Sequence, residues 1–103
     1  MIALKEGRCV GTVSLFEQDC ATRPAYTPWL ASLYTDPTYR GQGIAEKLIE
    51  SLLALAIEFG HSTVYLRTDN ATDYYLARGW LHVETTESGL DICKRDILNQ
   101  SLE

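Results

Sequence analysis

The chain has 103 residues, which is enough for one domain and too few for two. Apolar residues make up 46% and charged residues 22%, which is ordinary globular usage and excludes a disordered or fibrous chain. The formal net charge is −5, and no basic stripe of the kind that binds nucleic acid is present. No apolar run is as long as a membrane span, and no signal sequence opens the chain. We therefore expect a single cytoplasmic domain over residues 1–103, without a nucleic-acid or membrane partner.

The cysteines are odd in number and far apart, at Cys9, Cys20 and Cys93. No Cys-x-x-Cys pair is present, so the sequence predicts neither a disulfide framework nor a metal site.

Extended apolar runs dominate the first third of the chain. They predict three strands, at residues 2–4, 9–16 and 29–35. Glu6-Gly7 lies between the first two runs and predicts a hairpin turn. Residues 17–28 are polar and hold two prolines, which indicates a loop. Asp36-Pro37 ends the third strand, because proline cannot donate to a sheet ladder.

The hydrophobic period then changes from that of a strand to that of a helix. Apolar residues recur every three or four positions, at Ile44, Leu48, Leu52, Leu55 and Phe59. Gly60 follows as the expected helix stop. The remaining elements are a strand at residues 63–68, a short helix at 71–78, and a hairpin of strands at 81–85 and 90–94. The order β-β-β-α-β-α-β-β predicts an α/β (α+β) domain with a mixed, mostly antiparallel twisted sheet of about six strands.

The segment between the third strand and the long helix is the part of the sequence that indicates chemistry. It reads DPTYRGQGIA over residues 36–45. Free amides at a helix start bind anions, and glycines let the backbone approach a phosphate closely. A phosphate-binding P-loop needs Lys after its last glycine, but Ile44 follows Gly43; a dinucleotide fingerprint needs a third glycine where Glu46 stands. An ordinary glycine-rich turn remains the alternative.

Three stretches of this sequence resemble the GNAT superfamily of acyl-CoA-dependent N-acyltransferases. Arg40, Gly43 and Ala45 match its pyrophosphate signature (Q/R)-x-x-G-x-(G/A), although Thr35 stands where valine is common. Residues 70–80, NATDYYLARGW, resemble the family's second block, and residues 3–16 resemble the hairpin before the cofactor strand. Together the stretches cover nearly the whole chain in the right order, so the resemblance implies the GNAT fold and acetyl-CoA as co-substrate.

The resemblance also implies how coenzyme A is held. Its pyrophosphate would lie on backbone amides at the helix start, and its pantetheine arm would pair with the strand before the loop. The cofactor-binding residues implied in this way are Leu33, Tyr34, Thr35, Arg40, Gly41, Gln42, Gly43, Ile44, Ala45 and Asn70. The alternative interpretation of Arg40 is a solvated loop residue. The alternative interpretation of Asn70 is the N-cap of the second helix.

Tyr75 is the expected catalytic residue, at the family position whose hydroxyl faces the thioester sulfur. It would protonate the leaving thiolate during direct transfer to a primary amine of a small molecule or peptide, while a backbone N–H of the cofactor strand polarises the carbonyl. Core packing is the alternative reading of this tyrosine. No general base can be assigned, and Glu17, Asp19 or a water chain remain open.

Family members usually begin with a strand and two helices that this sequence lacks. We therefore expect the first strand to be an exposed edge, and the chain to form a homodimer. Two other functions stay open: a non-catalytic acyl-CoA-binding or regulatory module, and a structural sheet domain with a fortuitous glycine loop.

Overall fold

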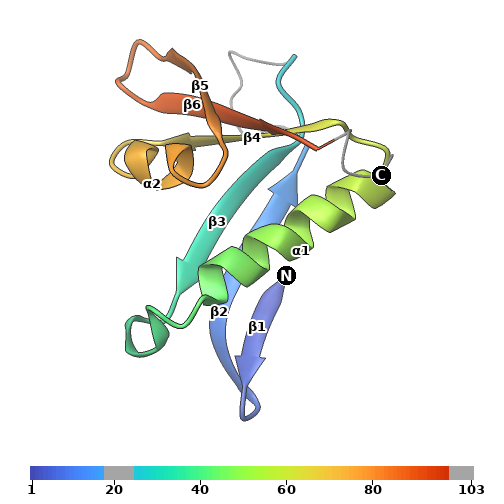
Figure 1. Ribbon diagram of the computed structural model, residues 1–103, viewed down its shortest axis with the longest axis vertical. Helices are drawn as coiled ribbons and strands as arrows, with labels where there is room; N and C mark the ends of the chain where they lie inside the picture. Colours follow the sequence, from blue (N-terminus) through green and yellow to red (C-terminus); the bar gives the residue numbers. More distant parts are fainter. Residues whose placement is uncertain (18–24, 98–103) are drawn as a thin grey trace.

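The computed structural model describes residues 1–17 and 25–97 (Figure 1). Its strands are β1 (Ile2–Lys5), β2 (Arg8–Phe16), β3 (Trp29–Thr35), β4 (Thr63–Thr68), β5 (Leu81–Thr85) and β6 (Asp91–Asp96). Its helices are the 3-10 turn Pro37–Tyr39, α1 (Ile44–Glu58) and α2 (Thr72–Leu76). The predicted fold class and order of elements are confirmed.

Two predicted boundaries are wrong by two residues, and the others agree within one residue. The second helix ends at Leu76 instead of residue 78, because the chain turns at Ala77 and the N–H groups of Arg78 and Trp80 both donate to the Tyr75 carbonyl. The last strand runs on to Asp96, since its whole length pairs with β4 as far as Thr63.

The six strands form one sheet in the order β1-β2-β3-β4-β6-β5. All neighbouring pairs are antiparallel except β3 and β4, which are parallel. β3 and β4 share one registered pair, Trp29 with Tyr65, and the Tyr65 N–H donates to the Pro28 carbonyl at 2.9 Å. Beyond that point the two strands diverge, as Figure 1 shows. The sheet is therefore split into a β1-β2-β3 part and a β4-β6-β5 part that meet at one end.

Helix α1 lies across β2 and β3 and covers one face of the sheet (Figure 1). Its buried side chains are Leu48, Ile49, Leu52, Leu53 and Ala56, and they pack with residues of β2, β3 and β4 in one core cluster. Phe59 was expected on this stripe but is 67% exposed. It is the C-cap residue, so it lies beyond the last helical turn that the sheet covers.

In the described part of the chain, no helix is long and apolar enough to cross a membrane. Cys93 is buried and Cys9 is exposed, whereas Cys20 lies outside the described residues.

Candidate active site

The gap between β3 and β4 opens into a cavity of about 830 Å³ on the helix side of the sheet. Its walls come from the end of β3, the loop into α1 with the first turn of that helix, and α2 with the residues before it. The lining residues are Leu33, Thr35, Tyr39, Arg40, Gly41, Gly43, Ile44, Ala45, Glu46, Asn70, Ala71, Tyr74, Tyr75 and Arg78. The cavity therefore joins two of the three sequence stretches that carry the family resemblance, the loop before α1 and residues 70–80.

The edge of β3 that faces the cavity has unused backbone groups. The Asp36 N–H donates to the Val10 carbonyl at 2.7 Å, so Asp36 and, by alternation along the strand, Tyr34 direct their backbone groups toward β2. Leu33 and Thr35 then direct theirs toward the gap, where β4 has no registered partner for them. An extended ligand could therefore form backbone hydrogen bonds with this edge, as an added strand would.

A β-bulge interrupts β3 just before this edge. Ser32 and Leu33 together lie opposite Val13 of β2, and Ser32 has a φ of 58°, in the left-handed region. The Thr12 hydroxyl donates to the Ser32 carbonyl at 3.2 Å and holds it on the β2 side. A serine in this conformation costs about 1–3 kcal/mol and a bulge leaves a residue without its ladder partner. The strand thus turns the Leu33 N–H toward the cavity, and the sequence predicts a polarising backbone N–H on this strand without assigning it to a residue.

The loop before α1 presents the amides of the helix start. The Asp36 carboxylate accepts the Thr38 N–H at 2.9 Å and fixes the 3-10 turn that follows β3. Gly43 is the N-cap with a φ of 76°, and the first helical bond runs from the Lys47 N–H to its carbonyl. The amides of residues 44–46 therefore precede the first helical bond, and the positive end of the helix dipole adds to their attraction for an anion.

Tyr75 is 8% exposed and packs edge-on against Trp80 and Tyr74. Among the residues that the structure describes, its hydroxyl has no hydrogen-bond partner, although the residue lines the cavity. Burial raises the pKa of Tyr75 above its ordinary value. The side chain is therefore a packed core residue that also offers a protonated hydroxyl to the cavity, so the two readings of this tyrosine are compatible.

Two predicted residues do not line the cavity. The Tyr34 side chain is 53% exposed and points away, since side chains alternate along a strand and Leu33 and Thr35 take the cavity side. Gln42 faces the other side of the helix start, where its amide oxygen accepts from Lys5 Nζ at 2.7 Å. Of the two, Gln42 keeps a backbone amide near the helix start as a candidate for ligand contact, whereas the backbone groups of Tyr34 are directed toward β2.

The start of α2 is held by a residue that the sequence reasoning missed. Thr68 Oγ1 accepts the N–H of Ala71 at 3.0 Å and that of Asn70 at 3.4 Å. Ala71 is the N-cap, so the reading of Asn70 as the cap is wrong. Asn70 lines the cavity, and its amide stays a predicted ligand contact.

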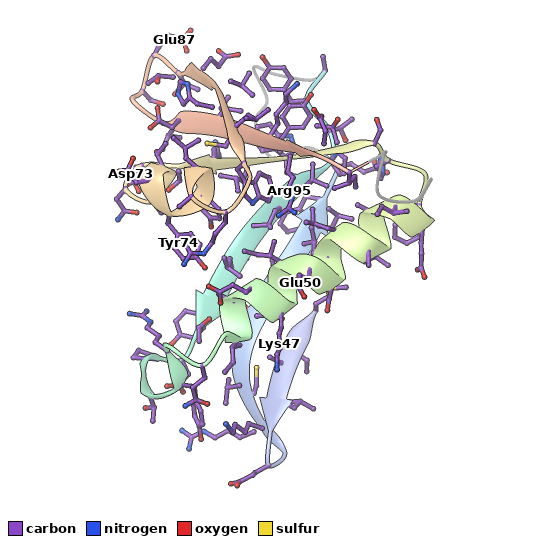
Figure 2. All side chains as sticks on the ribbon, in the orientation of Figure 1. Lys47, Glu50, Asp73, Tyr74, Glu87 and Arg95 are labelled. Carbon is purple, nitrogen blue, oxygen red and sulfur yellow. The ribbon has the colours of Figure 1, made fainter. Side chains whose placement is uncertain are left out.

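A cluster of Glu46, Tyr74 and Arg78 bridges α1 and α2 at the cavity wall, and the sequence reasoning missed it as well. Glu46 Oε1 accepts from the Tyr74 hydroxyl at 3.1 Å and from Arg78 Nε at 3.3 Å. The Arg78 guanidinium lies 3.6 Å from the Tyr74 ring centroid, and Figure 2 shows Tyr74 extending from α2 toward the start of α1. Glu46 lies 28 positions from Tyr74 and 32 from Arg78, so no local pattern could reveal its contacts with them.

A general base is not evident among the described residues. Glu17 is exposed and absent from the cavity lining, and Asp19 lies outside the described residues. Glu46 is the carboxylate of the described lining, and it is already bonded to Tyr74 and Arg78.

The split sheet defines a small domain whose cavity suits a ligand with an extended arm and an anionic end. The family model described as Acetyltransferase (GNAT) family matches residues 1–80. N-acetyltransferase 8B of Homo sapiens is 38% identical over 69 residues, which are 67% of this chain and 30% of the relative. Thialysine N-epsilon-acetyltransferase of Bos taurus is 32% identical over 78 residues, which are 72% of this chain and 46% of the relative. This chain belongs to the GNAT acetyltransferase family.

Solved structures agree with this family at the level of the fold. Aminoglycoside 6'-acetyltransferase type Ii has a TM-score of 0.77 at 19% identity, over 92% of this chain and 66% of that one. N-acetylglutamate synthase from Neisseria gonorrhoeae, complexed with coenzyme A and N-acetyl-glutamate, has a TM-score of 0.76 at 20% identity, over 92% of this chain and 24% of that one. The chain spans less than half the length of the two curated relatives.

Proposed function

We propose that this chain binds acetyl-CoA in the cavity between β3 and β4 and transfers the acetyl group to a primary amine. The observation that carries the proposal is the coincidence of three groups in one cavity: the free β3 edge, the amides at the start of α1 and the Tyr75 hydroxyl. These groups suit, respectively, a pantetheine arm, a pyrophosphate and a thioester sulfur. Family membership supports the same reaction.

In the proposed reaction the amine nitrogen attacks the acetyl carbon to give a tetrahedral intermediate, and the carbon–sulfur bond breaks when this intermediate collapses. The free amide at the Ser32–Leu33 bulge would donate to the carbonyl oxygen as negative charge develops there. The Tyr75 hydroxyl would give its proton to the departing sulfur. We assign removal of the amine proton to water, because Glu46, the one carboxylate of the described lining, lies in the first turn of α1, at the proposed pyrophosphate end of the cavity.

A primary alkyl amine is the acceptor class that the comparisons favour. The bovine relative is by name an acetyltransferase of an ε-amino group, and the acidic balance of this chain suits a cationic acceptor. Such an amine is protonated at neutral pH, with about one molecule in 10³ reactive at pH 7. Turnover should therefore rise with pH through the neutral range.

Release of free thiol tests the proposal. With acetyl-CoA and a panel of polyamine, aminoglycoside and lysine-peptide acceptors, we expect thiol release that depends on the amine. Thermal stabilisation by acetyl-CoA without thiol release from any acceptor would instead favour the non-catalytic acyl-CoA-binding or regulatory module. The absence of an evident base in the described cavity lining is the observation that keeps that second function open.

We also propose that the chain forms a homodimer through β1. Within the described chain β1 pairs with β2 alone, and its Ile2 and Leu4 side chains are 61% and 62% exposed. An apolar edge strand of this kind is normally covered. Gel filtration with light scattering should give twice the mass of the chain, and a monomer at micromolar concentration would remove the proposal. Cytoplasmic location stays a prediction of the sequence.

A further inference from the structure

The Glu46–Tyr74–Arg78 cluster lies in the proposed cofactor cavity, although the cofactor-binding residues predicted from the sequence include none of its members. All three residues line the proposed cofactor cavity, and they link its α1 wall to its α2 wall. Glu46 and Arg78 side chains are 44% and 40% exposed, and an ion pair that exposed contributes little to stability. The stability gained from the Glu46–Arg78 ion pair therefore does not explain why a negatively charged side chain lines a cavity that is proposed to bind the polyanion coenzyme A.

The Glu46 carboxylate accepts hydrogen bonds from donors that could also bind a phosphate. Its own backbone N–H, at the start of α1, is the largest cause that lowers its pKa; burial opposes, and the bonds from Tyr74 and Arg78 lower it further. The Glu46 carboxylate thus accepts hydrogen bonds from a phenol and a guanidinium at once. These are the donors that a phosphate oxygen prefers.

The Arg78 guanidinium uses only part of its hydrogen-bonding capacity. Its printed bonds use Nε, to Glu46, and Nη1, to the Tyr74 carbonyl at 3.0 Å. The remaining guanidinium donors have no partner within the described residues. Two contacts of Arg78 do not involve the carboxylate: its guanidinium carbon lies 3.6 Å from the Tyr74 ring centroid, and its Nη1 donates to the Tyr74 carbonyl.

We propose that Arg78 contacts a phosphate of coenzyme A and that Glu46 holds Arg78 in the ligand-free site, so that phosphate and carboxylate exchange on the same guanidinium. This inference rests on the proposed function. It makes Arg78 a cofactor-binding residue, and it makes Glu46 an internal competitor that weakens binding of the anionic end of the ligand. Ligands without phosphate gain nothing from the exchange.

The test is titration calorimetry on the full chain with coenzyme A, 3′-dephospho-coenzyme A and pantetheine. Arg78→Gln should weaken coenzyme A binding about tenfold, the value of a lost charge-assisted hydrogen bond, and leave pantetheine unchanged. Glu46→Gln keeps the size of the side chain and removes its charge, so it should tighten coenzyme A about threefold to tenfold. A gain of affinity cannot arise from misfolding. The double variant should behave as Arg78→Gln, because no cation remains to be released.

Glu50→Gln is the matched control. Glu50 follows Glu46 by four residues on α1, where Figure 2 labels it, and it does not line the cavity. It removes the same charge and should leave the affinity for coenzyme A unchanged. The dephospho compound decides which phosphate Arg78 contacts: an unchanged effect of Arg78→Gln assigns the pyrophosphate, and a lost effect assigns the 3′-phosphate.

Two results would overturn the inference while leaving the proposed function intact. One is wild-type binding of coenzyme A that neither Glu46→Gln nor Arg78→Gln alters by more than twofold. The other is an equal effect of each variant on coenzyme A and pantetheine, which would make the cluster a structural link between α1 and α2. A wild-type chain that binds no coenzyme A would instead contradict the proposed function itself, and the inference with it.

Discussion

Gly11 of β2 sets how closely α1 approaches the sheet, and Gly11→Ala is the substitution that tests this most sharply. The residue is buried opposite Thr35 at the end of β3. An added Cβ would lie 3.0 Å from the Tyr34 carbonyl oxygen, 3.0 Å from Leu48 Cδ1 and 3.1 Å from Ile44 Cγ2. The two side-chain ends can rotate aside, but the carbonyl belongs to the β2–β3 ladder and cannot move without disturbing it.

We expect Gly11→Ala to lower the free energy of unfolding by about 1–3 kcal/mol, the usual cost of overpacking. At about 4–8 °C per kcal/mol for a domain of this size, the melting temperature should fall by at least about 4 °C. Coenzyme A affinity should fall as well, because Ile44 begins the helix whose amides face the cavity. Denaturant unfolding and calorimetric titration measure the two effects.

Gly60→Ala is the control for this experiment. Gly60 has a φ of 87° and nothing within 4 Å of its added Cβ, so the substitution costs about 1–2 kcal/mol through backbone strain alone. It lies at the far end of α1 from the cavity and should destabilise the chain without changing ligand affinity. Stability of Gly11→Ala within about 0.5 kcal/mol of the parent, as for an ordinary surface change, would refute the argument from close approach.

Tyr75→Phe should lower thiol release about 100-fold while leaving acetyl-CoA affinity within a few-fold, and unchanged turnover across the pH range would remove Tyr75 as the acid. Because burial raises the pKa of Tyr75, the parent should lose activity only above the ordinary tyrosine range near pH 10. Leu52→Ala, at a side chain with 0% exposure, should cost about 2–5 kcal/mol in denaturant unfolding, and a cost below about 1 kcal/mol would show that the core is not packed there as described. Hydrogen bonds from Thr72, Thr85 and His82, in that order, hold the pKa of Asp91 at about 2, below its ordinary 3.8. The ionised Asp91 carboxylate therefore stabilises the fold above about pH 4, and this stabilisation is lost as the pH falls toward 2. The melting temperature of Asp91→Asn should lack this part of the pH dependence.

The sequence predicts the fold and the cofactor end of the site because both depend on local patterns. The Arg40, Gly43 and Ala45 signature lies within six consecutive residues where the loop enters α1, and the glycine conformation that starts α1 is a property of a single residue. The change from strand to helix period at Ile44 is equally local. These features need no knowledge of which elements meet.

The remaining site features arise from contacts between distant segments. Ser32 adopts a left-handed φ that nothing in its residue type signals, because pairing with β2 imposes it. Glu46 and Arg78 meet only once α1 and α2 have packed on the two halves of the split sheet. Phe59 fits the helical stripe by spacing, but its exposure depends on where the sheet ends. Such features follow from tertiary geometry, which periodicity does not encode.

The central claim is that the cavity between β3 and β4 holds acetyl-CoA. Thermal unfolding of the parent chain with acetyl-CoA, coenzyme A, NAD and ATP at equal concentration tests it most directly. The account predicts stabilisation by the two coenzyme A compounds, about 2.7 kcal/mol at a ligand concentration 100 times the dissociation constant, and none by NAD or ATP. An unchanged melting temperature with acetyl-CoA, or an equal rise with NAD or ATP, would contradict it.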